Sequence, residues 1–327
     1  MSMNRADDAP QHRRHVTETQ RLPATAEGIA TAGALLRSGA LVAFATETVY
    51  GLGADARNGA AVAEVYAVKE RPEFNPLIVH VAAISDAQRI AHWSDHAERL
   101  SNAFWPGPLT LVLPLKADAG LSSLVTAGLQ SVALRIPAGQ SGRALITAAG
   151  GAIAAPSANP SGRISPTTAD HVLAGLGGRI AAVLDDGACS IGLESTIIGL
   201  TGAHPCLLRA GGLAHEDIKR VLTLQIQPPS GGEITAPGQL ASHYAPRATV
   251  RLNAAGPVAG EVMLGFGAVP GDLNLSPDGN LHQAAAQLFA HLHVLDAMQK
   301  PIAVAPIPGS GLGVAINDRL RRAAAPR

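Results

Sequence analysis

Apolar and polar positions along the chain follow a pattern typical of an α/β protein. From residue 25 onward, short apolar runs rich in β-branched residues alternate with Ala-rich stretches whose apolar positions have helical spacing. The Ala-rich stretches predict helices near residues 26–38 and 60–68. The apolar runs predict strands over residues 41–45, 77–81, 109–115, 132–136, 152–155, 181–184, 196–199 and 206–208. Since some consecutive strands have no helix between them, we expect a twisted mixed sheet.

A change of pattern divides the chain into two domains. Residues 225–247, QIQPPSGGEITAPGQLASHYAPR, contain four prolines and three glycines and predict a linker. Residues 248–327 then form a second α/β unit of about 80 residues, long enough for a small Rossmann-like domain. Its pattern predicts strands near residues 248–252, 261–266 and 301–305, and helices at 281–297 and 313–323. The first domain would span residues 23–224, after a polar tail over residues 1–22 that is expected to be disordered.

Composition and charge narrow the class of ligand. The chain has 327 residues, of which 47% are hydrophobic, and this supplies apolar material for two cores. Lys plus Arg and Asp plus Glu both number 25, so no global positive field exists to hold a polyanion such as tRNA. We therefore expect a small charged ligand and no stable direct binding of nucleic acid.

Cysteine usage and hydropathy bear on the compartment. Cys189 and Cys206 form no CxxC pair and are too few for a disulfide framework, which favours structural thiols in a reducing cytosol. No stretch of about 18 uninterrupted apolar residues occurs, and the N-terminal segment has no apolar signal region. The expectation is a cytoplasmic protein that no membrane anchors.

Two segments offer groups that suit phosphate. In KERPEFNP, Pro72 favours an extended Arg71, so Lys69 and Arg71 can project to the same side and meet one anion such as a triphosphate. A solvated charged turn is the alternative. In APSANPSGRISP, the prolines likewise let Ser157 and Asn159 point the same way, as suits phosphate or ribose. An ordinary loop at a strand end is the alternative there.

The segment FATETVYGLGADA predicts a buried strand followed by turns at Gly51 and Gly53. This would expose Thr46 and Thr48 at the carboxyl end of a strand, where ligands bind in open α/β sheets. Thr48 could then hydrogen-bond a small polar substrate. The alternative is an ordinary β-branched strand residue.

Other polar residues stand in or beside apolar runs. Arg135 in VALRIP should be buried, so it needs either a substrate carboxylate or an internal acidic partner. His80 ends the run LIVHV, where a structural histidine is the common alternative to a ligand. Glu194, Ser195 and Arg209 stand at strand ends from which side chains can reach into a cleft. Ser195 lacks a GxSxG elbow, which argues against a nucleophilic role.

The order and spacing of these segments together resemble the YrdC-like threonylcarbamoyl-adenylate synthases, in their long two-domain form. The resemblance rests on FATETVYGLGA, KERPEFNPLIVHV, FWPGPLTLVL, VALRIP, APSANPSG, GLESTII, LLRAGG, APGQLASHYAP and GLGVAINDRLRRAA, which cover nearly all the chain after residue 25. Two departures are visible: Ala45 replaces a proline that is usual in the family, and the middle of APGQLASHYAP differs. Neither change removes a polar group.

The resemblance implies a YrdC-like catalytic domain, a smaller Rossmann-like domain and a linker that acts as a lid. It also implies ATP-dependent synthesis of L-threonylcarbamoyladenylate from L-threonine and bicarbonate, with release of pyrophosphate, for modification of a tRNA adenosine. Lys69 and Arg71 would be catalytic. The ATP-binding residues it implies are Lys69, Arg71, Asn75, Ser131, Ser157, Asn159, Ser165, Arg209, His243 and Tyr244. The threonine-binding residues are Thr48, His80, Arg135, Ala155 and Ser195.

The resemblance further implies Mg²⁺, held mainly by the ATP phosphates, and a downstream tRNA threonylcarbamoyl transferase complex that receives the product. One alternative is a non-catalytic YrdC-like module that binds RNA, which the balanced charge opposes. A carbamoyl transferase with a YrdC-like domain is a second alternative. It would need zinc-finger-like and acylphosphatase-like segments that this sequence lacks.

Overall fold

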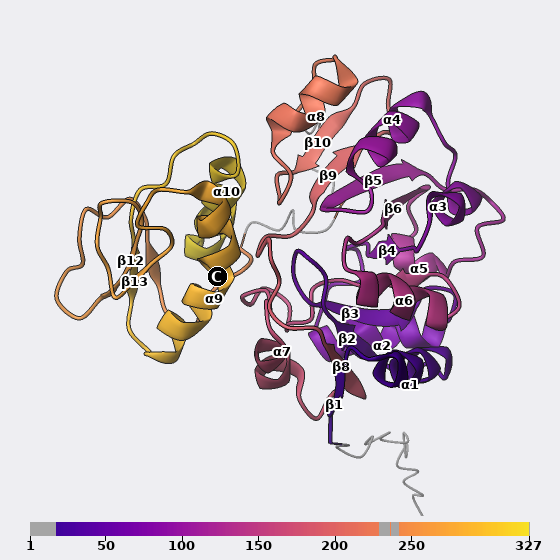
Figure 1. The fold of residues 1–327 in the computed structure, drawn as a ribbon, viewed down its shortest axis with the longest axis horizontal. Coiled ribbons are helices and arrows are strands. Elements are labelled where there is room, and N and C mark those ends of the chain that lie inside the picture. The colour runs from indigo at the N-terminus through magenta and orange to yellow at the C-terminus, as the bar shows by residue number, and fades with distance from the viewer. Residues whose placement is uncertain (1–17, 229–235, 237–241, 327) are drawn as a thin grey trace, which may run out of the picture.

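The computed structural model describes residues 18–228, 236 and 242–326, which fold into two domains (Figure 1). Within residues 18–228, a ten-stranded sheet has the strand order β1-β8-β2-β3-β7-β4-β6-β5-β9-β10. The strands are β1 (Gln20–Pro23), β2 (Val42–Phe44), β3 (Gly51–Asp55), β4 (Ile78–His80), β5 (Leu109–Pro114), β6 (Ser131–Arg135), β7 (Ile153–Ala154), β8 (Ala182–Asp185), β9 (Thr196–Gly199) and β10 (Cys206–Arg209). Strands β4 and β6 pair in parallel whereas β2 and β3 are antiparallel, so the predicted mixed sheet is confirmed.

Helices pack on both faces of this sheet. They are α1 (Ala26–Arg37), α2 (Gly59–Lys69), α3 (Ile84–Ile90), α4 (Asp95–Phe104), α5 (Ser123–Thr126), α6 (Gln140–Ala148), α7 (Ala169–Leu176) and α8 (His215–Leu222). In β2, Val42 and Phe44 share a core with residues of α1 and α6, whereas Ala43 belongs to the core on the opposite face, which includes residues of α2. Because successive side chains of a strand point to opposite faces of the sheet, β2 contributes to both cores.

Strand β3 lies where the glycines of FATETVYGLGADA predicted a turn, so that prediction is wrong. The chain turns between β2 and β3 instead, and β3 pairs with both β2 and β7. Here glycine serves close packing: a Cβ atom at Gly53 would lie 3.0 Å from the backbone oxygen of Val42 and 3.0 Å from the side chain of Ile153.

The predicted tail over residues 1–22 is wrong at its end, because Gln20–Pro23 form β1 and pair in parallel with β8. This edge strand is largely exposed, so apolar burial gave no signal for it. Ion pairs support it instead: Arg21 contacts Asp170 at 2.8 Å and Asp185 at 2.7 Å. Residues 1–17 lie outside the described residues.

The second domain is a small α/β unit. Within residues 242–326, an all-parallel sheet has the order β11-β14-β12-β13, with β11 (Val250–Arg251), β12 (Val262–Gly265), β13 (Leu273–Asn274) and β14 (Ile302–Val304). Helices α9 (Leu281–Ala297) and α10 (Gly313–Ala324) lie on the side of this sheet that faces the first domain (Figure 1). The predicted Rossmann-like domain is confirmed, except that the two-residue β13 was not predicted.

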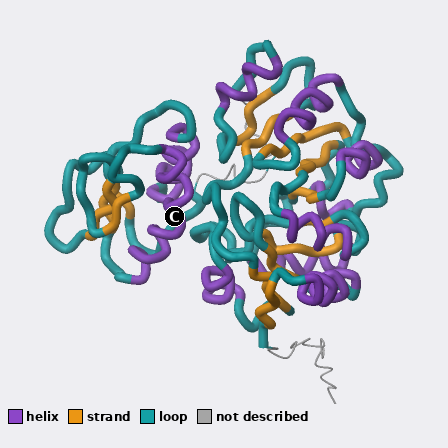
Figure 2. The backbone as a smooth tube through the Cα atoms, viewed as in Figure 1, coloured by secondary structure: helices purple, strands orange, loops and turns teal. Residues whose placement is uncertain are grey.

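The two domains pack closely. Val49, Ile164 and Leu193 of the first domain belong to the apolar core of the second. Gly192 has a φ of +72° in the left-handed region, and a Cβ atom there would lie 2.5 Å from the backbone oxygen of Ala285 in α9. Figure 2 shows that the first domain meets α9 and α10 mainly through loops.

Part of the predicted linker, residues 229–235 and 237–241, lies outside the described residues. The end of the linker contacts the first domain, where the backbone N–H of Ala245 donates to the oxygen of Gly162 at 2.8 Å. A search of the described helices finds none with the length and apolar character needed to cross a membrane.

Candidate active site

A pocket lies in the first domain where several strands end. Its lining comes from the β2–β3 loop, the ends of β4, β6 and β10, the segments after β7 and before β9, and the end of the linker. The lining residues are Thr46, Thr48, Val49, Gly51, Arg71, Ile78, His80, Arg135, Ala155, Pro156, Ser157, Glu194, Ser195, Arg209, His243 and Tyr244. The lining combines apolar side chains with several charged and polar ones, which suits a small polar molecule.

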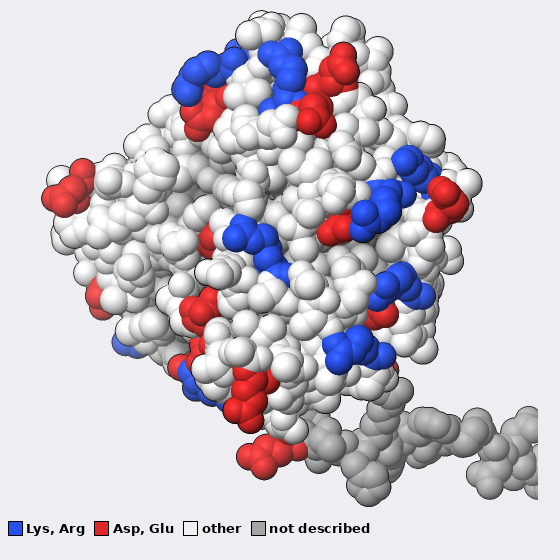
Figure 3. Space-filling model, turned by 45° about the vertical axis from the view of Figure 1, so that its right-hand side comes forward, with Lys and Arg blue, Asp and Glu red and all other residues white. Residues whose placement is uncertain are grey.

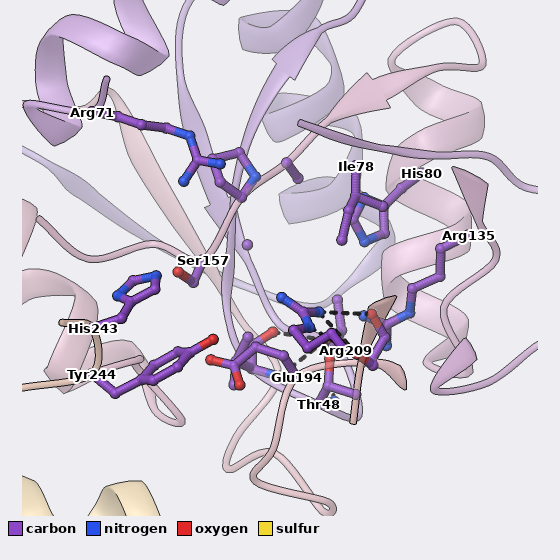
Figure 4. Close-up of a pocket in the computed structure, with 16 residues that line it drawn as sticks. Thr48, Arg71, Ile78, His80, Arg135, Ser157, Glu194, Arg209, His243 and Tyr244 are labelled. Carbon is purple, nitrogen blue, oxygen red and sulfur yellow. Dashed lines mark hydrogen bonds between the residues drawn. The ribbon is translucent and has the colours of Figure 1, made fainter. Parts of the chain in front are cut away.

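The pocket gathers both predicted sets of binding residues. The residues predicted for threonine all line it: Thr48, His80, Arg135, Ala155 and Ser195. Of the residues predicted for ATP, those that line it are Arg71, Ser157, Arg209, His243 and Tyr244. In Figure 4, His243 and Tyr244 lie on the side of the pocket opposite His80 and Arg135. The pocket therefore has one end lined by His243 and Tyr244 of the ATP set and another lined by His80 and Arg135 of the threonine set.

Lys69 lies behind the pocket wall and holds part of it in place. As the last residue of α2 it is only 1% exposed, and its ammonium group donates to the backbone oxygen of Ser157 at 2.5 Å and to that of Asn159. Burial, and then the charge of Arg71, lower the pKa of Lys69 well below its usual value. Burial of Lys69 near Arg71 excludes the solvated charged turn, but only Arg71 lines the pocket, so the prediction that both side chains meet one anion stays a prediction.

Arg71 is buried at the pocket, and its guanidinium group is oriented by the chain that follows it. Its Nε donates to the oxygen of Asn75 at 3.2 Å, and a terminal nitrogen donates to the oxygen of Pro76 at 2.9 Å. Burial lowers the pKa of Arg71 to about 10, so the group stays charged at neutral pH. An oriented, poorly hydrated cation of this kind suits an anionic ligand.

The other predicted ATP residues do not line the pocket. Ser165 lies behind it and donates its hydroxyl to Glu194 at 2.5 Å. The Asn159 side chain donates to the oxygens of its own loop, at Pro160 and Arg163. Ser131 begins β6, at the opposite end of that strand from Arg135. The assignments of Asn75, Asn159, Ser165 and Ser131 to ATP stay predictions.

Buried polar atoms without a hydrogen-bond partner gather around the pocket. Among the described residues, they are both amide atoms of Asn75, Oδ1 of Asn159, the Nδ1 atoms of His80, His243 and His291, and the hydroxyl of Tyr244. All but His291, in α9, belong to predicted site residues. An unpaired buried polar group costs about 1–3 kcal/mol. Their concentration here indicates a site that a polar ligand completes.

Arg135 lines the pocket and also has the internal acidic partner that its sequence context allowed. Its guanidinium group contacts Glu47 at 2.6 Å, and the two side chains are 4% and 8% exposed. The other Glu47 oxygen accepts from the backbone N–H of Ala138 at 2.9 Å, and Nε of Arg135 donates to the oxygen of Gly107 at 3.2 Å. The ion pair fixes the orientation of Arg135 at the predicted threonine end.

Ser195 is held by hydrogen bonds that suit a binding role. Its hydroxyl lies 2.7 Å from that of Thr110, and Arg209 donates to its backbone oxygen at 2.9 Å and to its hydroxyl at 3.2 Å. Thr110 and Arg209 are not bases that could activate the hydroxyl, in line with the argument against a nucleophile. Arg209 of the predicted ATP set thus holds Ser195 of the predicted threonine set in place.

Two pocket histidines stay neutral well below their usual titration range. Burial, and then the charge of Arg135, lower the pKa of His80 to about 3. Burial lowers the pKa of His243 to about 3, and the charges of Arg71 and Lys69 act in the same direction. Below pH 6.5 the unfolded chain therefore binds protons at these positions that the folded protein does not bind.

This difference predicts acid destabilisation. The stability that the two neutral imidazoles contribute is fully present above the unfolded imidazole pKa of about 6.5 and is lost as the pH falls toward about 3. Lowering the pH from 7.5 to 5.5 should therefore reduce the free energy of unfolding by about 3 kcal/mol through these two groups. Urea unfolding at both pH values measures the change. In a His80→Gln variant the difference should fall by about 1.4 kcal/mol, the share of one imidazole. An equal free energy of unfolding at both pH values would refute buried neutral imidazoles.

Some pocket residues were not predicted. Val49 and Ile78 line the pocket, and Glu47 supports it through its ion pair with Arg135. These roles depend on contacts between distant parts of the chain, which the sequence does not show. Glu194 was noted at a strand end without a role. Among the described residues, no group of three His, Cys, Asp or Glu side chains is arranged to hold a metal ion.

The comparisons with known proteins agree with this geometry. The model of the Sua5/YciO/YrdC family, described as "Telomere recombination", matches residues 34–211, and the model described as "Threonylcarbamoyl-AMP synthase, C-terminal domain" matches residues 213–325. The threonylcarbamoyl-AMP synthase of Bacillus subtilis is 40% identical over 95% of this chain and 97% of its own. That of Pyrococcus abyssi is 38% identical over 90% of this chain and 93% of its own.

A solved structure extends the likeness to the whole fold. The crystal structure of Pyrococcus abyssi Sua5 complexed with L-threonine matches with a TM-score of 0.86 and 36% identity, and the match covers 94% of this chain and 98% of that chain. The predicted fold class and the predicted resemblance are both confirmed. With both family models matched in order and the relatives covered nearly end to end, the chain belongs to the threonylcarbamoyl-AMP synthase family, in its two-domain form.

Proposed function

We propose that this protein converts L-threonine, bicarbonate and ATP to L-threonylcarbamoyladenylate and pyrophosphate, for threonylcarbamoyl modification of a tRNA adenosine. The observation that carries the proposal is one pocket with two chemically different ends. Arg71, His243 and Tyr244 lie toward one end and Arg135 and His80 toward the other, with Arg209 between them. The first end suits a triphosphate and the second an amino acid.

The reaction needs no covalent enzyme intermediate. The neutral threonine amine adds to bicarbonate, a molecule of water leaves, and an N-carboxylate results. A carboxylate oxygen then bonds to the α-phosphorus of ATP while the bond to the β-phosphate oxygen breaks, and pyrophosphate departs with that electron pair. The task of the protein is to align the two substrates and to neutralise their charge. Lys69, Arg71 and Arg209 supply that charge at the ATP end.

In this proposal Mg²⁺ arrives with ATP and is held mainly by the phosphates. Glu194 is the carboxylate among the pocket-lining residues, and both of its oxygens already accept hydrogen bonds, from Ser165 and Arg319. The side chains present therefore fit a MgATP complex better than an ion bound by the protein alone, because Mg²⁺ tolerates phosphate and water ligands.

The rival, a module that only binds RNA, receives less support. On the face in Figure 3, Lys and Arg side chains lie among Asp and Glu side chains and do not gather in one basic area. We infer that the product passes to a tRNA threonylcarbamoyl transferase complex in the cytoplasm, and that this chain does not hold tRNA itself.

Pyrophosphate release from MgATP by the purified protein tests the proposal. We expect release that requires both L-threonine and bicarbonate and that an Arg71→Ala variant loses by at least about 100-fold, because an oriented cation is removed from the phosphate end. An Arg57→Ala variant is the control, since Arg57 pairs with Asp55 at 2.8 Å outside the pocket. ATP turnover that ignores threonine would refute the proposed function.

A further inference from the structure

Arg319 of the second domain is buried against the first. It lies in α10 and is 0% exposed, and its Nε donates to an oxygen of Glu194 at 2.8 Å. A terminal nitrogen donates to the backbone oxygen of Ala210 at 2.9 Å, next to Arg209 in the chain. The other terminal nitrogen contacts Asp318 of the same helix at 2.7 Å. This side chain therefore joins the second domain to the wall of the pocket.

Glu194 lies between two cations. Arg319 is its ion-pair partner, and Arg209 lies near it in the pocket wall (Figure 4). Burial alone would raise the pKa of Glu194, but the charges of Arg319 and then Arg209 lower it below its usual value, so the carboxylate stays ionised. Its second oxygen accepts the hydroxyl of Ser165 at 2.5 Å. An anion thus lines a pocket whose proposed ligand carries a triphosphate.

Arg319 also supports the end of the linker. Its guanidinium carbon lies 4.9 Å from the ring centre of Tyr244, a distance typical of a cation–π contact. The Tyr244 ring stacks on His243 at 4.1 Å and packs with Phe289 of α9 at 5.7 Å. Two helices of the second domain therefore hold the aromatic pair that covers the ATP end of the pocket.

We propose that Arg319 is a positioning residue for ATP: it neutralises Glu194 and supports Tyr244, so that the carboxylate of Glu194 does not repel the triphosphate. The inference rests on the proposed function for the identity of the ligand. Without Arg319, the ionised Glu194 loses its ion-pair partner and presents an unbalanced negative charge to the phosphates. The hydrogen bonds of Arg319 go to Glu194, Asp318 and Ala210, and none of these residues lies at the threonine end with Thr48, His80 and Arg135.

The test is steady-state kinetics of an Arg319→Met variant, with Arg321→Met as the matched control because Arg321 is exposed on the same helix. We expect the KM for ATP to rise about 30-fold, the loss typical of one charge-assisted contact to a phosphate, while the KM for threonine stays within about twofold. Equal rises in both KM values, or a fall in thermal stability with unchanged KM values, would overturn the inference and leave Arg319 a structural residue.

A double variant separates charge from folding. Arg319→Met with Glu194→Gln removes the unpaired anion, so its KM for ATP should lie within about threefold of the Glu194→Gln single variant, a non-additive result. Additive losses would overturn the proposed role. Calorimetric titration of each variant with MgATP gives the same comparison without turnover. If the wild type bound ATP but released no pyrophosphate, the proposed reaction would be refuted. The ATP affinities from calorimetry would still test the role of Arg319.

Discussion

A Lys69→Met variant is expected to lose about 1,000-fold in kcat/KM for threonine-dependent pyrophosphate release, equivalent to about 4 kcal/mol of transition-state stabilisation. Lys69 lies beside Arg71 and holds the Ser157–Asn159 segment through two backbone oxygens. Its removal therefore takes away one positive charge and loosens the wall that faces the phosphates. Developing negative charge on the phosphates makes both losses larger in the transition state.

The same variant should stay folded. Met has a similar length, and it removes a buried ammonium group whose desolvation is unfavourable, which offsets the two oxygens left unpaired. Lys116→Met is the matched control, since Lys116 also donates to a backbone oxygen, that of Gln88 at 2.7 Å, away from the pocket. Activity of Lys69→Met within tenfold of the wild type would mean that Lys69 only anchors the loop.

The sequence predicted the strands that are continuous apolar runs, but not the edge strand β1 or the glycine-containing inner strand β3. Strands such as β5 are continuous apolar runs, and their burial follows from that pattern. Strand β1 has no such run, because backbone pairing and the ion pairs of Arg21 hold it at the edge. The glycines of β3 serve close strand packing, which depends on neighbours that the sequence order does not reveal.

The site was predictable where a motif concentrates polar groups at one strand end. Arg71, Ser157 and Arg209 were found this way. The acidic partners were not, because the fold brings them together from far apart in the chain: Glu47 and Arg135 are 88 residues apart, and Glu194 and Arg319 are 125 apart. Such pairs depend on strand order and domain packing, which local patterns do not encode.

These two ion pairs give the pocket a common construction. Each is a buried pair of a carboxylate and an arginine. Glu47 pairs with Arg135 at the threonine end, and Glu194 pairs with Arg319 at the ATP end. Burying an ion pair adds little net stability, whereas breaking one is costly. Here each pair orients its side chains, so that defined groups face a substrate, and it balances the buried charge of the pocket wall.

The second large effect is expected at Arg135. An Arg135→Met variant should lose about 3–5 kcal/mol in free energy of unfolding, because Glu47 is left as a buried anion without its partner. Urea unfolding at pH 7.5 measures this loss. The variant should also bind threonine more weakly, since the guanidinium group is predicted to hold the substrate carboxylate.

Adding Glu47→Gln separates the two roles of Arg135. The double variant no longer buries an unpaired charge, so it should recover most of the lost stability, to within about 1–2 kcal/mol of the wild type. Its KM for threonine should nevertheless stay raised by about 100-fold, because a neutral Met–Gln pair offers the substrate carboxylate no cation. Recovery of threonine affinity together with stability would show that Arg135 acts only through the fold, whereas recovery of stability alone would assign the carboxylate contact to Arg135.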